Sequence, residues 1–270
     1  MITTAILTGM PRSGTSWAGQ LLDASPNVSY KMSPLFSYAF KNRLSEESTP
    51  GDWLQFVKEV FVSDDDFLNQ KTRRMQGQYP TFQKEPLNDS YLVMKFDRFQ
   101  NLIEPALDRM PELKVICIIR NPCGAIHSWL TAPREFPADA DPLEHWRSGR
   151  IKKKWEGDHY GFDDWIWFAR LALRLAKEFP QRVMIMRYES LVADAIGQVT
   201  KMYEFLGLSL HQQVLEFISD SQTQHMDGDY SVFKNPAVAT RWLLELNPVI
   251  QDAILSELVN TDLEEFLGLP

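Results

Sequence analysis

Residues 3–17 have the sequence TTAILTGMPRSGTSW. The apolar run 3–8 stops at Gly9, and residues 15–23 then follow a helical pattern of apolar positions. This order predicts a strand, a tight loop and a helix. Gly9 and Gly14 have the spacing G-x-x-x-x-G of a phosphate-binding loop. Glycines let such a loop turn tightly, so that successive N–H groups converge on an anion at the start of the helix.

The residue after the second glycine separates this loop from those that bind nucleoside triphosphates. Those loops carry lysine there, which reaches the β- and γ-phosphates, whereas this chain has Thr15. Its cation is Arg12, inside the loop, and Thr15 and Ser16 add hydroxyl donors. The sequence places no clear acidic residue after a strand to help hold magnesium. We therefore predict a site for a phosphate-like anion that works without a metal ion.

The remaining pattern predicts an α/β fold. Short apolar runs predict further buried strands at 91–95, 113–119 and 182–187. Helical spacing predicts helices at 99–110, 163–179 and 194–206, with Pro105 kinking the first of them or marking its early turn. Strands that alternate with helices indicate a central parallel sheet with helices on both faces, in a P-loop-like nucleotide-binding fold whose ligand lies at the carboxyl ends of the strands. We expect one domain over residues 1–270.

Two long stretches, 45–89 and 132–163, lack a clear pattern and are expected to be irregular lids or binding loops. The lysine run 152–154 is expected to lie on a solvated face. The regions that no motif covers are rich in aromatic residues, which favours an aromatic-lined pocket there. These residues are Phe36, Tyr38, Trp53, Phe56, Tyr79, Phe82, Trp146 and Trp155.

The composition limits the classes of partner. The chain has 270 residues, of which 44% are hydrophobic, and a formal net charge of −8. This charge argues against duplex DNA or an anionic membrane as the main partner, because both favour a basic surface. Cys117 and Cys123 lack metal-ligand spacing, and residues 1–14 lack the basic start of a signal peptide. We expect a soluble, cytoplasmic protein that binds neither nucleic acid nor membrane.

The loop resembles the first signature of the sulfotransferases that depend on 3′-phosphoadenosine-5′-phosphosulfate (PAPS). That signature has the form P-[KR]-S-G-T-[ST]-W, and residues 11–17 (PRSGTSW) match every position. The resemblance implies that Trp17 contacts the adenine of PAPS. It also implies that the 5′-phosphosulfate is gripped by Arg12, Ser13, Gly14, Thr15 and Ser16.

The second signature of this family is an arginine at a strand end, then Asn-Pro, then a serine eight residues after the arginine. Here Arg120 follows a predicted strand and Ser128 stands eight residues later. An arginine fork and a hydroxyl suit a 3′-phosphate, which ATP lacks. The resemblance further implies that Tyr188 approaches the adenine, that residues 230–236 close over the nucleotide, and that Arg241 adds a contact to the 3′-phosphate.

The resemblance also suggests which residues act in catalysis. Arg12 would stabilise the charge of the leaving group, and Lys95, at a predicted strand end, would be a second cation. The cytosolic members of the family have histidine two residues after this lysine, but this chain has Asp97. Asp97 can act as the base if its pKa is raised, or it can pair with Lys95 or Arg98. Glu85 is the rival base, since some polysaccharide sulfotransferases use such a glutamate.

The implied reaction moves a sulfuryl group from PAPS to a hydroxyl or amine, on a small-molecule or glycan acceptor, and leaves adenosine 3′,5′-bisphosphate (PAP). One alternative is a small-molecule kinase with the same loop spacing, although the missing lysine after Gly14 and the second anion site argue against it. The other is a PAPS-binding module without activity, which the replacement of histidine by Asp97 keeps open.

Overall fold

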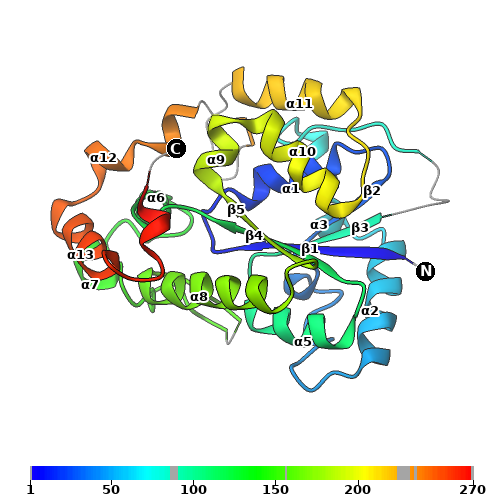
Figure 1. The fold of residues 1–270 in the computed structure, drawn as a ribbon, viewed down its shortest axis with the longest axis horizontal. Coiled ribbons are helices and arrows are strands. Elements are labelled where there is room, and N and C mark those ends of the chain that lie inside the picture. The colour runs from blue at the N-terminus through cyan, green and yellow to red at the C-terminus, as the bar shows by residue number, and fades with distance from the viewer. Residues whose placement is uncertain (1, 86–90, 156, 224–231, 234–235, 269–270) are drawn as a thin grey trace.

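The computed structural model describes residues 2–85, 91–155, 157–223, 232–233 and 236–268. These residues form a five-stranded sheet in the order β2-β3-β1-β4-β5, in which all neighbouring strands are parallel (Figure 1). The strands are β1 (Thr3–Gly9), β2 (Val28–Met32), β3 (Tyr91–Phe96), β4 (Lys114–Ile119) and β5 (Val183–Arg187). The predicted α/β class and parallel sheet are confirmed.

Helices cover both faces of the sheet (Figure 1). One face carries α1 (Thr15–Asp23), α9 (Tyr188–Ala193), α10 (Ala195–Leu206) and α11 (Gln212–Thr223). The other carries α2 (Pro50–Val62), α5 (Ile103–Arg109) and α8 (Phe162–Glu178). Successive side chains of a strand point to opposite faces, so Ala5 and Leu7 of β1 pack in the first layer and Ile6 in the second.

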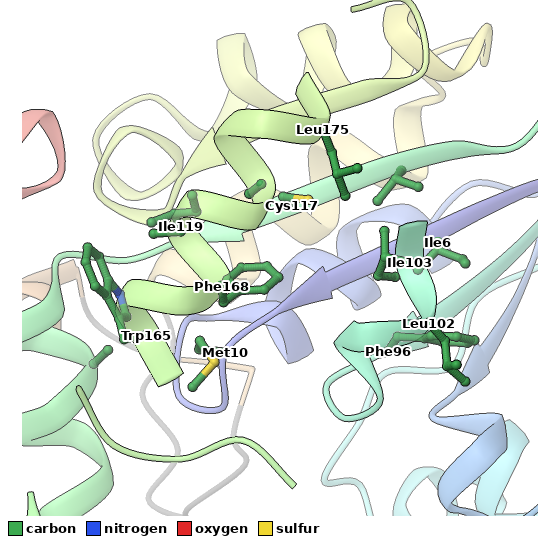
Figure 2. Close-up of a cluster of buried hydrophobic side chains, with 14 of the residues drawn as sticks. Ile6, Met10, Phe96, Leu102, Ile103, Cys117, Ile119, Trp165, Phe168 and Leu175 are labelled. Carbon is green, nitrogen blue, oxygen red and sulfur yellow. The ribbon is translucent and has the colours of Figure 1, made fainter. Parts of the chain in front are cut away.

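In the second layer, helix α8 packs closely on the sheet. Figure 2 shows Phe168 and Leu175 of α8 in the same buried cluster as Ile6 and Cys117 of the sheet. Cys117 is 1% exposed, and burial raises the pKa of its thiol to about 12. Cys117 is therefore a core residue.

The remaining helical segments connect these layers. They are η1 (Pro34–Phe36), α3 (Asp66–Asn69), α4 (Lys71–Met75), η3 (Gln100–Leu102), α6 (Pro122–Leu130), α7 (Pro142–His145), η4 (Pro236–Ala239), α12 (Trp242–Glu245), α13 (Pro248–Leu258) and η5 (Glu264–Leu267). Within the described ranges, no helix has the length and apolar composition needed to span a bilayer.

Strand β2 (VSYKM) was not predicted, because Ser29 and Lys31 interrupt the continuous apolar run that is typical of a parallel strand buried on both faces. Its Lys31 is 4% exposed, and the ammonium donates to the Ser63 carbonyl at 2.7 Å and to Asn69 Oδ1 at 2.8 Å. Burial lowers the pKa of Lys31 to about 8. A buried lysine with its own partners thus takes a place that the apolar pattern of a strand would give to a hydrophobic residue.

The prediction that residues 45–89 are irregular is wrong for much of that stretch, which contains α2, α3 and α4. Helix α2 begins with a capping box between Thr49 and Asp52 and has Pro50 at its first position. Its buried residues recur at helical spacing, and they are Trp53, Phe56, Val57 and Val60. By contrast, the described part of 132–163 is irregular apart from α7 and the first residues of α8.

Gly19 allows α1 to lie against β2. A Cβ atom at Gly19 would lie only 2.7 Å from Cζ of Tyr30, which real Cβ atoms do not approach. We expect Gly19→Ala to lower the free energy of unfolding by about 1–3 kcal/mol, the usual cost of overpacking, despite the better helix propensity of alanine. Urea unfolding of the purified variants measures this change.

Gly51→Ala is the matched control, because a Cβ there would meet only Thr49 Oγ1, at 3.6 Å. Gly51 is an exposed residue of α2, so alanine should leave stability unchanged or raise it by up to about 1 kcal/mol. If both substitutions raised the urea midpoint equally, the close packing of Gly19 on Tyr30 would be disproved.

Candidate active site

A cavity of about 260 Å³ lies at the carboxyl edge of the sheet, where a ligand was predicted. Each of the five strands delivers a lining residue within the first few positions after it ends. These residues are Arg12 after β1, Ser33 after β2, Asp97 after β3, Arg120 after β4 and Tyr188 after β5. The parallel sheet therefore gathers into one site residues that are far apart in the sequence.

The loop between β1 and α1 has the tight geometry that its glycines predict. Gly14 and Arg12 have φ angles of 87° and 70°, in the left-handed region, and Gly14 lies so close to the Tyr188 ring that a Cβ would overlap it. The Ser13 hydroxyl is buried and has no hydrogen-bond partner among the described residues. A loop of this shape at the start of α1 can hold an anion with its N–H groups.

Arg120 is 4% exposed and is fixed by groups from other strands. Its Nη1 donates to the Arg12 carbonyl at 2.9 Å, and its guanidinium lies 4.7 Å from the centre of the Tyr188 ring. Its own carbonyl accepts from the Trp165 indole at 3.0 Å. The Arg120 Nε is buried without a partner among the described residues. Ser128 accepts a hydrogen bond from Arg12 Nε at 3.3 Å. Arg120 and Ser128, the two residues of the predicted second anion site, both line the cavity.

The turn that follows Arg120 is also held at several points. Asn121 caps α6 by accepting from the Cys123 N–H at 2.9 Å, and its own N–H donates to Glu189 at 2.9 Å. Glu189 is 1% exposed, and burial raises its pKa although the bond from Asn121 opposes this. The Arg-Asn-Pro motif is thus both a part of the site and the joint between β4, α6 and the start of α9.

Lys95 and Asp97 face the same cavity, although β3 ends at Phe96, between them. The Lys95 ammonium is 3.1 Å from Ser16 Oγ and 3.1 Å from Asp97 Oδ2. The other carboxylate oxygen of Asp97 accepts a short hydrogen bond from the Ser33 hydroxyl. Lys95 is 2% exposed and the Asp97 side chain is 24% exposed, so this pair is a partly buried link between the anion loop and the rest of the cavity.

The pKa of Asp97 is lowered, whereas the role of base requires a raised pKa. Burial is the largest single influence and raises the pKa of Asp97. The charge of Lys95, the hydrogen bonds from Ser33 and Lys95, and the charge of Arg98 together outweigh burial. In this state Asp97 is an ionised carboxylate paired with Lys95.

Trp17, which was predicted to contact adenine, donates from its indole N–H to Ser221 Oγ at 2.9 Å. Trp17 and Tyr188 both line the cavity, as do Val192 and Val232. Of the segment 230–236, residues 230, 231, 234 and 235 lie outside the described residues, so the predicted closure over a nucleotide stays a prediction.

Three predicted site residues do not line the cavity: Ser13, which is buried beneath the anion loop's lining residues, Glu85 and Arg241. The Glu85 N–H donates to the Pro26 carbonyl at 3.1 Å, just before β2 begins. This is the amino edge of the sheet, roughly 15 Å from the carboxyl edge at about 3.3 Å per residue of strand. Arg241 is exposed, and its Nε donates a hydrogen bond to Glu245 at 3.0 Å. Trp242, the next residue along the chain, lies near Arg120.

Several lining residues were missed by the sequence analysis: Ser33, Phe67, Arg98, Glu135 and Tyr160. Ser33 follows the unpredicted strand β2, and Glu135 and Tyr160 lie in the irregular stretch 132–163. Of the aromatic residues singled out there, Phe36 lines the cavity, whereas Trp53 and Phe56 belong to the core. The run 152–154 is not simply solvated, because Lys152 pairs with Glu135 at 3.1 Å and Lys153 with Asp164 at 2.7 Å.

We expect Lys95→Met to raise the pKa of Asp97 above its ordinary value of 3.8, because burial would remain while the main opposing charge is removed. Carboxyl carbon NMR over a pH titration measures this, with Asp97→Asn to assign the signal. Arg98→Met should raise it less, since Arg98 is the weakest of the named influences. An unchanged Asp97 signal in Lys95→Met would show that Lys95 does not hold the carboxylate ionised.

A family model described as the sulfotransferase domain matches residues 3–241. Carbohydrate sulfotransferase 1 of Danio rerio is 28% identical over 151 residues, which are 52% of this chain and 34% of that protein. The match thus spans about a third of the length of that relative.

Solved structures share the fold. Mouse sulfotransferase SULT7A1 complexed with PAP has a TM-score of 0.54 at 16% identity, covering 98% of this chain and 88% of that one. The sulfotransferase domain from the curacin biosynthetic pathway has 0.54 at 16% identity, with 100% and 99% covered. Retinol dehydratase in complex with retinol and PAP has 0.56 at 13%, with 96% and 82% covered. Because the family model covers most of the chain, including both signatures, this chain belongs to the sulfotransferase domain family.

Proposed function

We propose that this chain transfers a sulfuryl group from PAPS to a hydroxyl or amine of an acceptor. The observation that carries the proposal is the buried Arg120 guanidinium, which lines, together with Ser128, the cavity that the anion loop opens into. This gives the nucleotide site a second group for a phosphate, which suits a 3′-phosphate. The complexes of SULT7A1 and retinol dehydratase with PAP support the same donor.

The residues present fit this donor. The Ser13 hydroxyl and the Arg120 Nε are buried and lack hydrogen-bond partners among the described residues. A bound anion would supply the missing acceptors. The loop N–H groups with Arg12 would hold the 5′-phosphosulfate, Arg120 and Ser128 the 3′-phosphate, and Trp17 with Tyr188 the adenine. The donor supplies a sulfur that an acceptor oxygen or nitrogen attacks while the bond from sulfur to the bridging oxygen breaks.

Two cations can stabilise the charge that develops on that bridging oxygen. Arg12 lies in the loop, and Lys95 reaches the loop through its bond to Ser16. An arginine keeps its proton at all working pH values, so the role of Arg12 is electrostatic. Preorganised charges of this kind commonly supply the largest part of catalysis in group transfer.

Asp97 is the residue that we propose as the proton acceptor. It lines the cavity next to Lys95, and Ser33 holds its carboxylate in place. A bound phosphosulfate would bring negative charge to Lys95, and a nearby like charge raises the pKa of a carboxylate. Asp97 would then be a stronger base in the complex than in the free protein, and the attacking hydroxyl would lose its proton to it.

Binding of PAP tests the donor assignment. We expect Arg120→Ala to weaken PAP binding by about 2–5 kcal/mol, the range for truncating one partner of a buried charge pair. Its effect on AMP, which lacks the 3′-phosphate, should be small. Isothermal titration gives both affinities.

The same measurement separates the alternatives. Unaltered protein should bind PAP more tightly than ADP, whereas a kinase would prefer ADP. Arg241→Ala is the matched control, because Arg241 pairs with Glu245 outside the cavity, and it should weaken PAP binding less than Arg120→Ala. Equal losses of PAP and AMP affinity in Arg120→Ala would remove this residue from the 3′-phosphate site.

Turnover tests the base. Incubation with PAPS and a metabolite extract, followed by mass spectrometry for a new sulfated product, supplies an acceptor. With it, Asp97→Asn should lower kcat about 10²–10⁴-fold, the usual contribution of proton abstraction, and leave PAP affinity nearly unchanged. Glu85→Gln is the control and should keep its kcat, because Glu85 lies at the opposite edge of the sheet. The reverse result would assign the base to Glu85 and leave Asp97 as an ion-pair residue.

A further inference from the structure

The half of the cavity next to Asp97 has one apolar wall and one polar wall. Met32, Phe36 and Phe67 form the apolar wall, in which the two phenylalanine rings lie 5.9 Å apart. Arg98, Glu135 and Tyr160 form the polar wall. The acceptor must enter beside both walls if Asp97 takes its proton, so their chemistry restricts what the acceptor can be.

The polar wall is a fixed row of hydrogen-bonding groups. The Tyr160 hydroxyl donates to Glu135 Oε2 at 3.2 Å and accepts from Arg98 Nη2 at 3.4 Å. The Phe36 ring covers the Arg98 guanidinium at 3.9 Å and fixes its plane. Because Arg98 is the residue after Asp97, this row begins directly beside the proposed base.

The charges of this row are balanced within the protein. Arg98 Nη1 lies 2.7 Å from Asp158 Oδ1, and Lys152 Nζ lies 3.1 Å from Glu135 Oε2. The side chains of Asp158 and Glu135 are only 3% and 8% exposed. A charged acceptor would compete with one of these partners, and breaking a buried ion pair is strongly unfavourable. A neutral hydroxyl can donate to Glu135 and accept from Arg98 with both pairs kept.

We propose that the acceptor is a neutral ring compound with two neighbouring hydroxyls. One hydroxyl attacks sulfur beside Asp97. The other bonds with the row of Arg98, Tyr160 and Glu135, while the ring lies on Phe36 and Phe67. This rests on the proposed function, which places the attacking oxygen. The second hydroxyl is needed because an acceptor that is apolar at this point would displace water from the row. The row would then lose its hydrogen bonds to that water and gain none in return.

Binding of three probes to the complex of the protein with PAP tests this without turnover. Phenol, catechol and salicylate share one ring and carry hydrogen, hydroxyl or carboxylate next to the phenolic hydroxyl. We expect catechol to bind at least about tenfold more tightly than phenol, as one well-made hydrogen bond allows, and salicylate no more tightly than phenol. Cyclohexanol and cis-1,2-cyclohexanediol repeat the comparison on a saturated ring and so distinguish an aryl acceptor from an alicyclic one.

The outcomes that overturn the proposal are distinct. Equal affinities for the diols and their single-hydroxyl partners, or no binding of any diol, would contradict the second hydroxyl. Tightest binding of salicylate would indicate an anionic acceptor and direct attention to Arg73, which also lines the cavity and donates to the Tyr79 hydroxyl at 3.1 Å. Failure of PAP itself to bind would instead contradict the proposed function.

Two variants locate the effect. In Glu135→Gln and Tyr160→Phe, the ratio of the phenol and catechol dissociation constants should fall toward one while PAP still binds, which shows that the fold is intact. Glu144→Gln is the matched control in the same stretch of chain, since the Glu144 side chain is 73% exposed, and its ratio should match that of the unaltered protein. A ratio that persisted in both cavity variants would remove the row from acceptor recognition.

Discussion

The hydrogen bond from Arg120 to the Arg12 carbonyl is the interaction on which the half of the cavity around the anion loop depends. It ties the segment after β4 to the loop after β1, and the Tyr188 ring after β5 lies against the same guanidinium. Burying a cation is costly unless its N–H groups find partners. A sequence that places arginine there must therefore bring three strand ends together, and this convergence also shapes the anion loop.

The fold was largely predictable, because parallel strands covered on both faces are short apolar runs and such runs stand out in a sequence. The helix 15–23 was predicted with its observed bounds, and α10 ends at Leu206 as predicted, with Gly207 after it at a φ of 77°. Strand β2 was missed because Lys31 finds partners in α3 and in the segment before it, which local sequence does not reveal. Helix α2 was missed although its capping box and its apolar spacing were present in the sequence.

The residues of the candidate site also fall into those that the sequence predicted and those that it did not. The residues of the two signatures were found because their chemistry is local: an anion loop, and an arginine before a helix that carries a serine. Glu135 and Tyr160 had no such signal, since the stretch that carries them is irregular and only the folded chain brings them beside Arg98. The sequence also left open whether Asp97 would be paired, and its bond to Lys95 answers that question for the free protein.

The two halves of the cavity are built from connections of very different length. The half around the anion loop uses the short turns after β1, β4 and β5, whereas the other half uses the long connections from β2 to β3 and from α6 to α8. Long surface connections accept insertions and substitutions far more readily than the elements that they join. Substitutions in these two connections can therefore reshape one half of the cavity while the short turns of the other half stay as they are.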